Sequence, residues 1–142
     1  MTGDDYIDLA TQLLAGGSEP HFRTAVSRAY YGAFHIGREF VRSCGILMPA
    51  SPEAHKHVRW CLANAGSREL DDAAVQLESL RSARNKADYD LSNRGFAKLP
   101  NVTIHVRRAA SMAAAIRAAK AADVAPAMRA YAQRVNLLLD SP

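Results

Sequence analysis

Apolar residues recur at intervals of three and four along nearly the whole chain, and this helical spacing is the feature that most constrains the fold. No segment alternates apolar and polar residues with a period of two, and no Asn-Gly or Asp-Gly turn is present. The sequence therefore predicts an all-α fold, an up-and-down bundle of four to six helices. The longest run of this spacing has apolar positions at Phe22, Val26, Tyr30, Ala33, Phe34, Gly37 and Val41.

Capping residues and helix breakers divide the chain into six predicted helices. Gly16 and Gly17 end the first helix, and Gly45 ends the second and longest one. Residues 92–101 contain many turn formers and are predicted to be a loop. We expect the second, fourth and fifth helices to form the centre of the bundle. The predicted starts are Asp4, Ser18, Ser51, Ser67, Asn101 and the position after Pro126, from which the last helix continues to Asp140.

The 142 residues are enough for one domain, so we expect a single domain over 1–142 with its core in about residues 20–120. The net charge of +4 permits a nucleic-acid partner without requiring one. No signal segment and no membrane-length apolar run is visible, so a cytoplasmic protein with no membrane partner is expected. Cys44 and Cys61 are predicted to be buried thiols, and Val58 and Trp60 to be core residues.

One predicted helix carries charged residues on its apolar arc. Arg84 and Asp88 lie where leucines are expected, and burying a charge is costly unless it is paired or faces a cleft or an interface. Two interpretations stay open: a structural network between helices or subunits, and a ligand-binding or catalytic site. An ion pair at a spacing of four within the helix is the simplest structural version. The arc consists of Leu70, Ala73, Leu77, Leu80, Arg84, Ala87, Asp88 and Leu91.

The longest predicted helix carries a polar stripe beside its apolar face, formed by Arg28, Tyr31, His35 and Arg38. Such a stripe is either a solvated side of the helix or a surface for phosphate and base contacts. If the two helices pack side by side, guanidinium groups would hold a phosphate and a histidine would move a proton. The candidate binding residues are Arg28, Tyr31, Arg81 and Asn85, and the candidate catalytic residues are Arg84, Asp88, Tyr89 and His35.

Several common enzyme signatures are missing from the sequence. It contains no phosphate loop, no glycine-rich nucleotide turn, no His-Glu-x-x-His and no Gly-x-Ser-x-Gly. His55 and His57 are two residues apart, so on a helix they point in different directions and are not expected to chelate a metal. We therefore expect neither a metal site nor a cofactor.

Two segments together resemble the HEPN superfamily: SRAYYGAFH on one helix and LRSARNKADYDL on a later one. The resemblance covers about residues 20–120 and is strongest to the branch with an Arg-Asn-x-Ala-Asp-Tyr ending. It implies a bundle of four to five helices that dimerises through the motif helix. It also implies a role in toxin–antitoxin or defence systems, often beside a small nucleotidyltransferase, and in many members metal-independent ribonuclease activity.

The ribonuclease pattern of that superfamily places a histidine four to six residues beyond the arginine. The corresponding positions hold Tyr89, Asp90 and Leu91 after Arg84, and Lys86, Ala87 and Asp88 after Arg81. The sequence therefore predicts a HEPN-like homodimer that binds RNA or a nucleotide phosphate, with an antitoxin or nucleotidyltransferase as partner. Two alternatives stay open. One is an active ribonuclease, in which Arg84 stabilises the phosphorane and His35, Asp88 or Tyr89 transfers protons. The other is a purely structural subunit.

Overall fold

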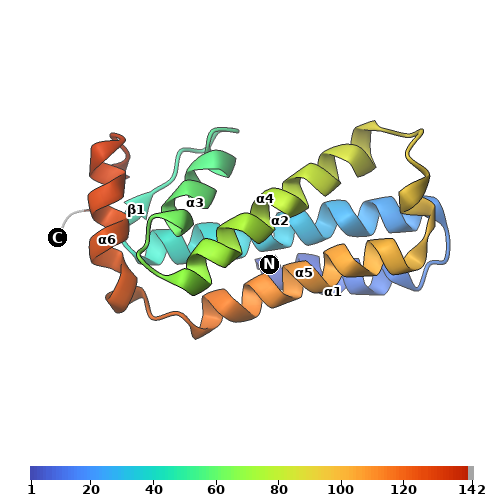
Figure 1. Cartoon of the computed structure of the whole chain (residues 1–142), viewed down its shortest axis with the longest axis horizontal. Coiled ribbons are helices and arrows are strands. Elements are labelled where there is room, and N and C mark those ends of the chain that lie inside the picture. The colour runs from blue at the N-terminus through green and yellow to red at the C-terminus, as the bar shows by residue number, and fades with distance from the viewer. Residues whose placement is uncertain (141–142) are drawn as a thin grey trace.

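A computed structural model describes residues 1–140 and confirms the all-α bundle (Figure 1). Among these residues the only strands are two antiparallel two-residue segments near the ends of α2 and α6, in which Ile46 pairs with Leu139. The elements are α1 (Gly3–Leu14), α2 (Glu19–Ser43), β1 (Ile46–Leu47), α3 (Ala54–Ala63), α4 (Arg68–Tyr89), the 3-10 helix η1 (Arg94–Ala97), α5 (Leu99–Ala118), α6 (Ala121–Arg134) and β2 (Leu138–Leu139).

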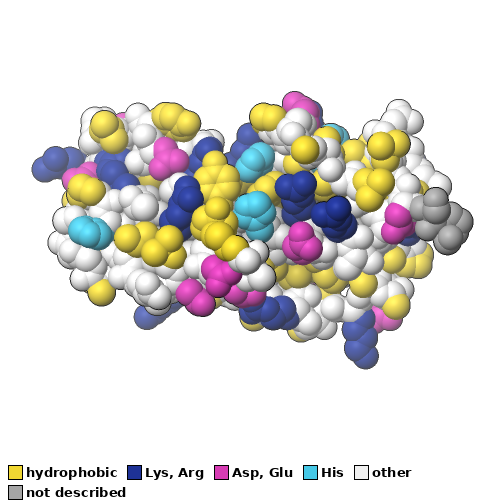
Figure 2. Space-filling model, turned by 180° about the vertical axis from the view of Figure 1, so that it is seen from behind, with side chains coloured by type: hydrophobic (Ala, Val, Ile, Leu, Met, Phe, Trp, Pro, Cys, Tyr) yellow, Lys and Arg dark blue, Asp and Glu magenta, His cyan; other side chains and the backbone are white. Residues whose placement is uncertain are grey.

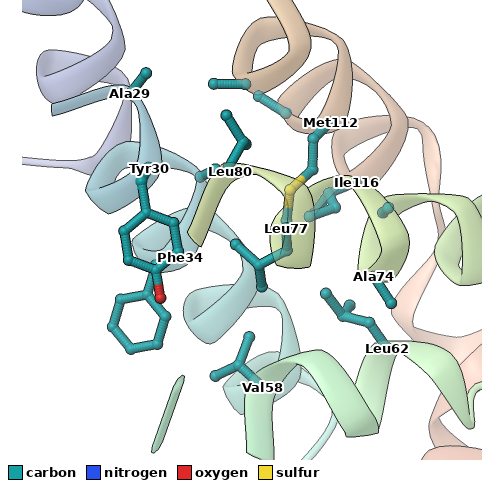
Figure 3. Close-up of a cluster of buried hydrophobic side chains, with 14 of the residues drawn as sticks. Ala29, Tyr30, Phe34, Val58, Leu62, Ala74, Leu77, Leu80, Met112 and Ile116 are labelled. Atoms are coloured by element: carbon teal, nitrogen blue, oxygen red, sulfur yellow. The ribbon is translucent and has the colours of Figure 1, made fainter. Parts of the chain in front are cut away.

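The central helices are α2, α4 and α5, as the sequence predicts. Leu77 and Leu80 of α4 are buried between Tyr30 of α2 and Met112 of α5, as the close-up shows (Figure 3). The helix α3 packs on α2 and α4, and α6 crosses one end of the bundle (Figure 1). The core therefore runs along α2, which is the longest helix and contacts every other helix of the central layer. Within residues 1–140, no helix has the length and apolar character needed to cross a membrane.

Most predicted helix ends are found where the capping residues place them. Ser18 is the N-cap of α2 and Pro20 lies in its first turn. The Ser67 hydroxyl accepts a hydrogen bond from the Leu70 N–H (3.2 Å) and caps α4. Gly45 follows α2 with a φ of 89°, a conformation that favours glycine.

The helices α1 and α2 cross at two glycines that the sequence did not single out. A methyl group added to Gly32 would lie 2.7 Å from the Gly3 carbonyl oxygen and 2.7 Å from Cγ1 of Ile7. Gly37 is also closely approached, because an added Cβ there would lie 3.1 Å from Cγ1 of Val58 on α3. These contacts show that α2 is approached closely from two sides.

Gly32→Ala is expected to lower the free energy of unfolding by about 1–3 kcal/mol, because the methyl group forces α1 away from α2. Urea denaturation measures this change. The exposed Ala110→Gly on α5 is the control: it reports the intrinsic helix preference for alanine, about 1 kcal/mol, which alone would make Gly32→Ala stabilising. A gain in stability at Gly32 would contradict the close crossing.

The prediction for the C-terminal segment is wrong. Leu138 and Leu139 lie in β2, not on the face of a last helix. Asn136 adopts a φ of 61°, in the left-handed region that terminates helices, and the Leu137 N–H donates to the Ala132 carbonyl (2.9 Å). The helix therefore stops before this point, and the chain turns back to pair with β1.

Three predicted helix starts also shift. Pro126 lies inside the second turn of α6, where a proline removes one backbone hydrogen bond of the helix. Asn101 does not cap α5 but lies in its first turn, from which its Nδ2 donates to the Gly95 carbonyl (3.2 Å) and holds η1. Ser51 lies in a turn that precedes α3.

The predicted burial is confirmed for Cys44 and Cys61 and for Val58 but not for Trp60. Trp60 is 39% exposed, and the guanidinium group of Arg59 lies 5.8 Å from the centre of its ring.

Candidate functional site

Arg84 lies at the boundary between α4 and α2, on the side of the arc that faces the aromatic residues of α2. Its Nη2 donates to the Tyr31 hydroxyl (2.7 Å), and its Nη1 donates to Oδ1 of Asn85 (2.6 Å). Its guanidinium group lies 5.2 Å from the ring centre of Tyr31 and 5.8 Å from that of Tyr30. The side chain is 19% exposed. Packing of α2 against α4 therefore brings together the two sequence features that were predicted to meet.

Asp88 lies one turn beyond Arg84 and contacts both helices. Its Oδ2 is 3.3 Å from Nε of Arg84 and 3.4 Å from Oγ of Ser27, whose hydroxyl also accepts from Nη2 of Arg28 (3.3 Å). The Arg84 Nε–H is buried and makes no hydrogen bond, so it does not donate to this carboxylate. The Arg84–Asp88 pair is therefore an electrostatic contact, and the predicted spacing-of-four pair is present in that form.

Two candidate catalytic residues lie away from Arg84. Tyr89 is the last residue of α4 and its side chain is 77% exposed. His35 stacks in parallel on Tyr6 of α1, with ring centres 5.6 Å apart. Arg28 connects this pair to the rest, because its guanidinium group lies 5.3 Å from the Tyr6 ring and 5.1 Å from the Tyr31 ring.

The structure adds a histidine that was not among the candidate residues predicted from the sequence. His55, at the start of α3, is hydrogen-bonded through Nδ1 to the hydroxyl of Tyr30. Its ring stacks on Phe34 with centres 4.2 Å apart. Tyr30 was predicted as an apolar core position, and its side chain is buried (Figure 3). A buried tyrosine hydroxyl needs a hydrogen-bond partner. The presence of a tyrosine at a predicted core position is therefore the only feature of the sequence that indicated such a contact.

The protonation of this pair follows from its surroundings. Burial raises the pKa of Tyr30 to about 12, although Arg81 and Arg84 act in the opposite direction. The phenol therefore keeps its proton, and because Nδ1 of His55 is the only hydrogen-bond partner of this buried hydroxyl among residues 1–140, the hydroxyl donates to Nδ1. Burial, followed by the charges of Arg81 and Arg84, lowers the pKa of His55. His55 is thus neutral at pH 7 and carries its own proton on Nε2, which donates to no residue among 1–140.

Arg81 and Arg38 are the two arginines of this region with no ion pair and no side-chain hydrogen bond to residues 1–140. Both are close enough to His55 for their charges to lower its pKa. The surface seen from behind shows histidine side chains near its middle, with positively charged side chains on both sides (Figure 2). We call this set the Arg–His face; its members are Arg28, Tyr30, Tyr31, His35, Arg38, His55, Arg81 and Arg84.

Known proteins do not identify the chain. No family model, no curated protein and no solved structure matches it. In the part of the chain that the structure describes, no group of three His, Cys, Asp or Glu side chains is arranged to hold a metal ion. The HEPN resemblance therefore stays a prediction.

The folded protein is expected to lose stability as the pH falls from 7 toward 5. Burial lowers the pKa of three histidines, His35, His55 and His105, below the ordinary 6.5. The unfolded chain therefore binds more protons than the folded chain once the pH passes below about 6.5. Their contribution to stability is complete above that pH and is lost as the pH falls toward the folded-state pKa values.

Thermal denaturation at several pH values measures this loss. His55→Gln is expected to flatten part of the dependence, because it removes one of the three histidines whose pKa is lowered by burial. Equal pH profiles for the wild type and His55→Gln would contradict the neutral state of His55.

Proposed function

We propose that the chain binds phosphate groups of RNA or of nucleotides at the Arg–His face and does not cleave them. One observation carries the proposal: this face presents donors without matching acceptors. Arg38 and Arg81 make no ion pair with residues 1–140, and the Nε2–H of His55 has no acceptor there. Phosphate oxygens are the natural complement of guanidinium groups and of a neutral N–H donor.

The same geometry speaks against proton transfer by His55, Tyr30 or His35. A general base needs a lone pair directed at the substrate, but Nδ1 of His55 already accepts from Tyr30. Tyr30 itself has a pKa of about 12, so it does not ionise at neutral pH. His35 stacks on Tyr6 and makes no contact with Arg84. These contacts support binding over the ribonuclease alternative.

The HEPN resemblance extends the proposal to the setting of the protein. We propose a cytoplasmic homodimer that works with an antitoxin or a nucleotidyltransferase in a toxin–antitoxin or related system. The helix α4, which carries Arg84, is the element through which such a dimer would form. Sedimentation and co-purification with the products of the neighbouring genes test this part separately.

Binding is tested with labelled single-stranded RNA and with inorganic tripolyphosphate. We expect saturable binding of both that weakens steeply as salt is raised, because phosphate contacts release counterions. We expect no shortening of the RNA over hours, with or without EDTA. Absence of binding at low salt would contradict the proposal. EDTA-resistant cleavage that Arg84→Ala abolishes, in a protein that stays folded, would establish the ribonuclease instead.

The structural alternative is favoured by the contacts of Arg84 with Tyr31, Asn85 and Asp88, and it makes a different prediction. If Arg84 and Asp88 only hold α4 against α2, the double variant Arg84→Met/Asp88→Leu is neutral or stabilising and changes no interaction. Under the proposed function this variant weakens tripolyphosphate binding although the fold is kept.

A further inference from the structure

A large hollow lies next to the Arg–His face. It is lined by the start of α1, the second half of α2, and the segment that leads from the end of α5 to the start of α6. The hollow has a volume of about 860 Å³, which is within the range of small-molecule sites. Ile36 and Phe40 of α2 and Ile116 of α5 give it an apolar floor.

The hollow shares His35 with the Arg–His face, and Tyr6, which stacks on His35, also lines the hollow. From this stacked pair a continuous row of contacts leads to Arg84: Arg28 lies over both Tyr6 and Tyr31, and the Tyr31 hydroxyl accepts from Arg84. One elongated ligand therefore has an apolar and aromatic pocket at one end and cationic donors at the other.

The charges at the two ends differ in a way that orients such a ligand. The rim of the hollow holds two carboxylates, Asp4 and Glu39, and one arginine, Arg117, which is ion-paired with Asp4. Glu39 makes no ion pair with residues 1–140, but the amino group of Met1 also lines the hollow, so the charges of the rim balance and, unlike the Arg–His face, the rim does not attract phosphate. The floor and the Tyr6–His35 pair suit a flat, uncharged group, because aromatic rings stack on any nucleobase.

We infer that the ligand is a nucleoside phosphate whose base lies in the hollow against Tyr6 and His35 while its phosphates lie on the Arg–His face. This inference rests on the proposed function and names the class of ligand. The base adds apolar contact and stacking to the phosphate contacts, so it is expected to raise the affinity over that of phosphate alone.

The experiment compares ATP, GTP, CTP and UTP with inorganic tripolyphosphate by calorimetric titration of untagged protein, because Met1 and Thr2 line the hollow. The preferred nucleotide is expected to bind about tenfold more tightly than tripolyphosphate, or better. Ala119→Phe fills the hollow from a residue in extended backbone (φ −75°, ψ 141°), where any side chain is allowed. It is expected to remove this advantage and leave tripolyphosphate binding unchanged. The exposed Ala114→Phe on α5 is the matched control.

The outcomes separate the two proposals. If nucleotides and tripolyphosphate bind equally, the base has no site and this inference is overturned, while the proposed function stands. If nucleotides bind more tightly and Ala119→Phe has no effect, the base lies elsewhere and the inference is also overturned. If neither class binds, the proposed function itself falls.

The nucleotide has two sources, a free nucleotide or the 5′ end of an RNA chain. Competition with a short 5′-triphosphorylated oligonucleotide distinguishes them. This oligonucleotide presents the same base and phosphates as a free nucleotide but carries an RNA chain, which the site must also accommodate. Displacement of the bound nucleotide by this oligonucleotide points to an RNA end, and failure to displace it points to a free nucleotide. Equal binding of an oligonucleotide with a 5′-hydroxyl end would overturn the inference.

Discussion

Arg23→Met is expected to lower the free energy of unfolding by about 3–5 kcal/mol, the largest effect on stability that the structure predicts for a single residue. Arg23 is 9% exposed and lies in the second turn of α2, facing the end of α4. Its guanidinium group donates to the carbonyl oxygens of Ala87 (2.8 Å), Asp90 (3.1 Å) and Asn93 (2.8 Å). It thereby caps the C-terminus of α4.

The cost of removing Arg23 has two sources. The carbonyl groups at the end of α4 lose their donors, and a buried acceptor without a partner costs about 1–3 kcal/mol. The helix also loses a positive charge at its negative end. Glu19, which accepts from Nε of Arg23 (2.9 Å), and Phe96, whose ring centre lies 5.1 Å from the guanidinium group, lose their partner as well.

Urea denaturation measures this effect, with the exposed Arg107→Met on α5 as the matched control. Arg23→Lys is expected to fall between the wild type and Arg23→Met, because an ammonium group cannot reach several carbonyls in one plane. A loss below about 1 kcal/mol for Arg23→Met, the range of an ordinary surface change, would contradict the capping role.

Reversing the two unpaired charges of the Arg–His face is expected to have the largest effect on function. Arg38→Glu/Arg81→Glu should weaken binding of tripolyphosphate by about 100-fold or more, because two charged hydrogen-bond donors are replaced by carboxylates that repel phosphate. Neither arginine has an ion pair with residues 1–140, so the thermal midpoint should change little.

The matched control for this variant is Arg68→Glu/Arg107→Glu, which changes the net charge equally at exposed positions away from the face. Steering by net charge alone would weaken binding equally in both variants. Equal losses would therefore contradict a local site, and an unchanged affinity in Arg38→Glu/Arg81→Glu would exclude this face from binding.

Periodicity and capping residues were sufficient to predict the bundle, because each central helix carries its own apolar stripe and its own end signals. The prediction of a helix for the C-terminal segment was wrong for a physical reason. Leu137 to Leu139 continue the helical pattern, but Asn136 turns the chain, and Arg129 holds the result by donating to the Gly45 carbonyl (3.1 Å) and to Asp140 (2.8 Å). Those contacts join segments that are distant in sequence and leave no local pattern.

The site was predicted only in part, because some of its contacts also join segments that are distant in sequence. Arg84 stood out because a charge interrupts an apolar arc. Arg23 satisfies the same criterion: it lies eighteen residues before Val41, about five helical turns, and so on the apolar face of α2. It was found only in the structure. His55 gives no such signal, since its importance depends on the tertiary contact between α3 and the buried Tyr30 hydroxyl.

The most direct test of the central claim is a titration of isotope-labelled protein with tripolyphosphate, followed by nuclear magnetic resonance of the imidazole and guanidinium nitrogens. In the free protein at pH 7, His55 is expected to be neutral with its proton on Nε2. Added tripolyphosphate is expected to shift the signals of His55, Arg81 and Arg38 together and with saturation. Binding that shifts signals elsewhere and leaves these three unchanged would contradict a phosphate site on the Arg–His face, and a protonated His55 in the free protein would contradict the neutral state assigned to it.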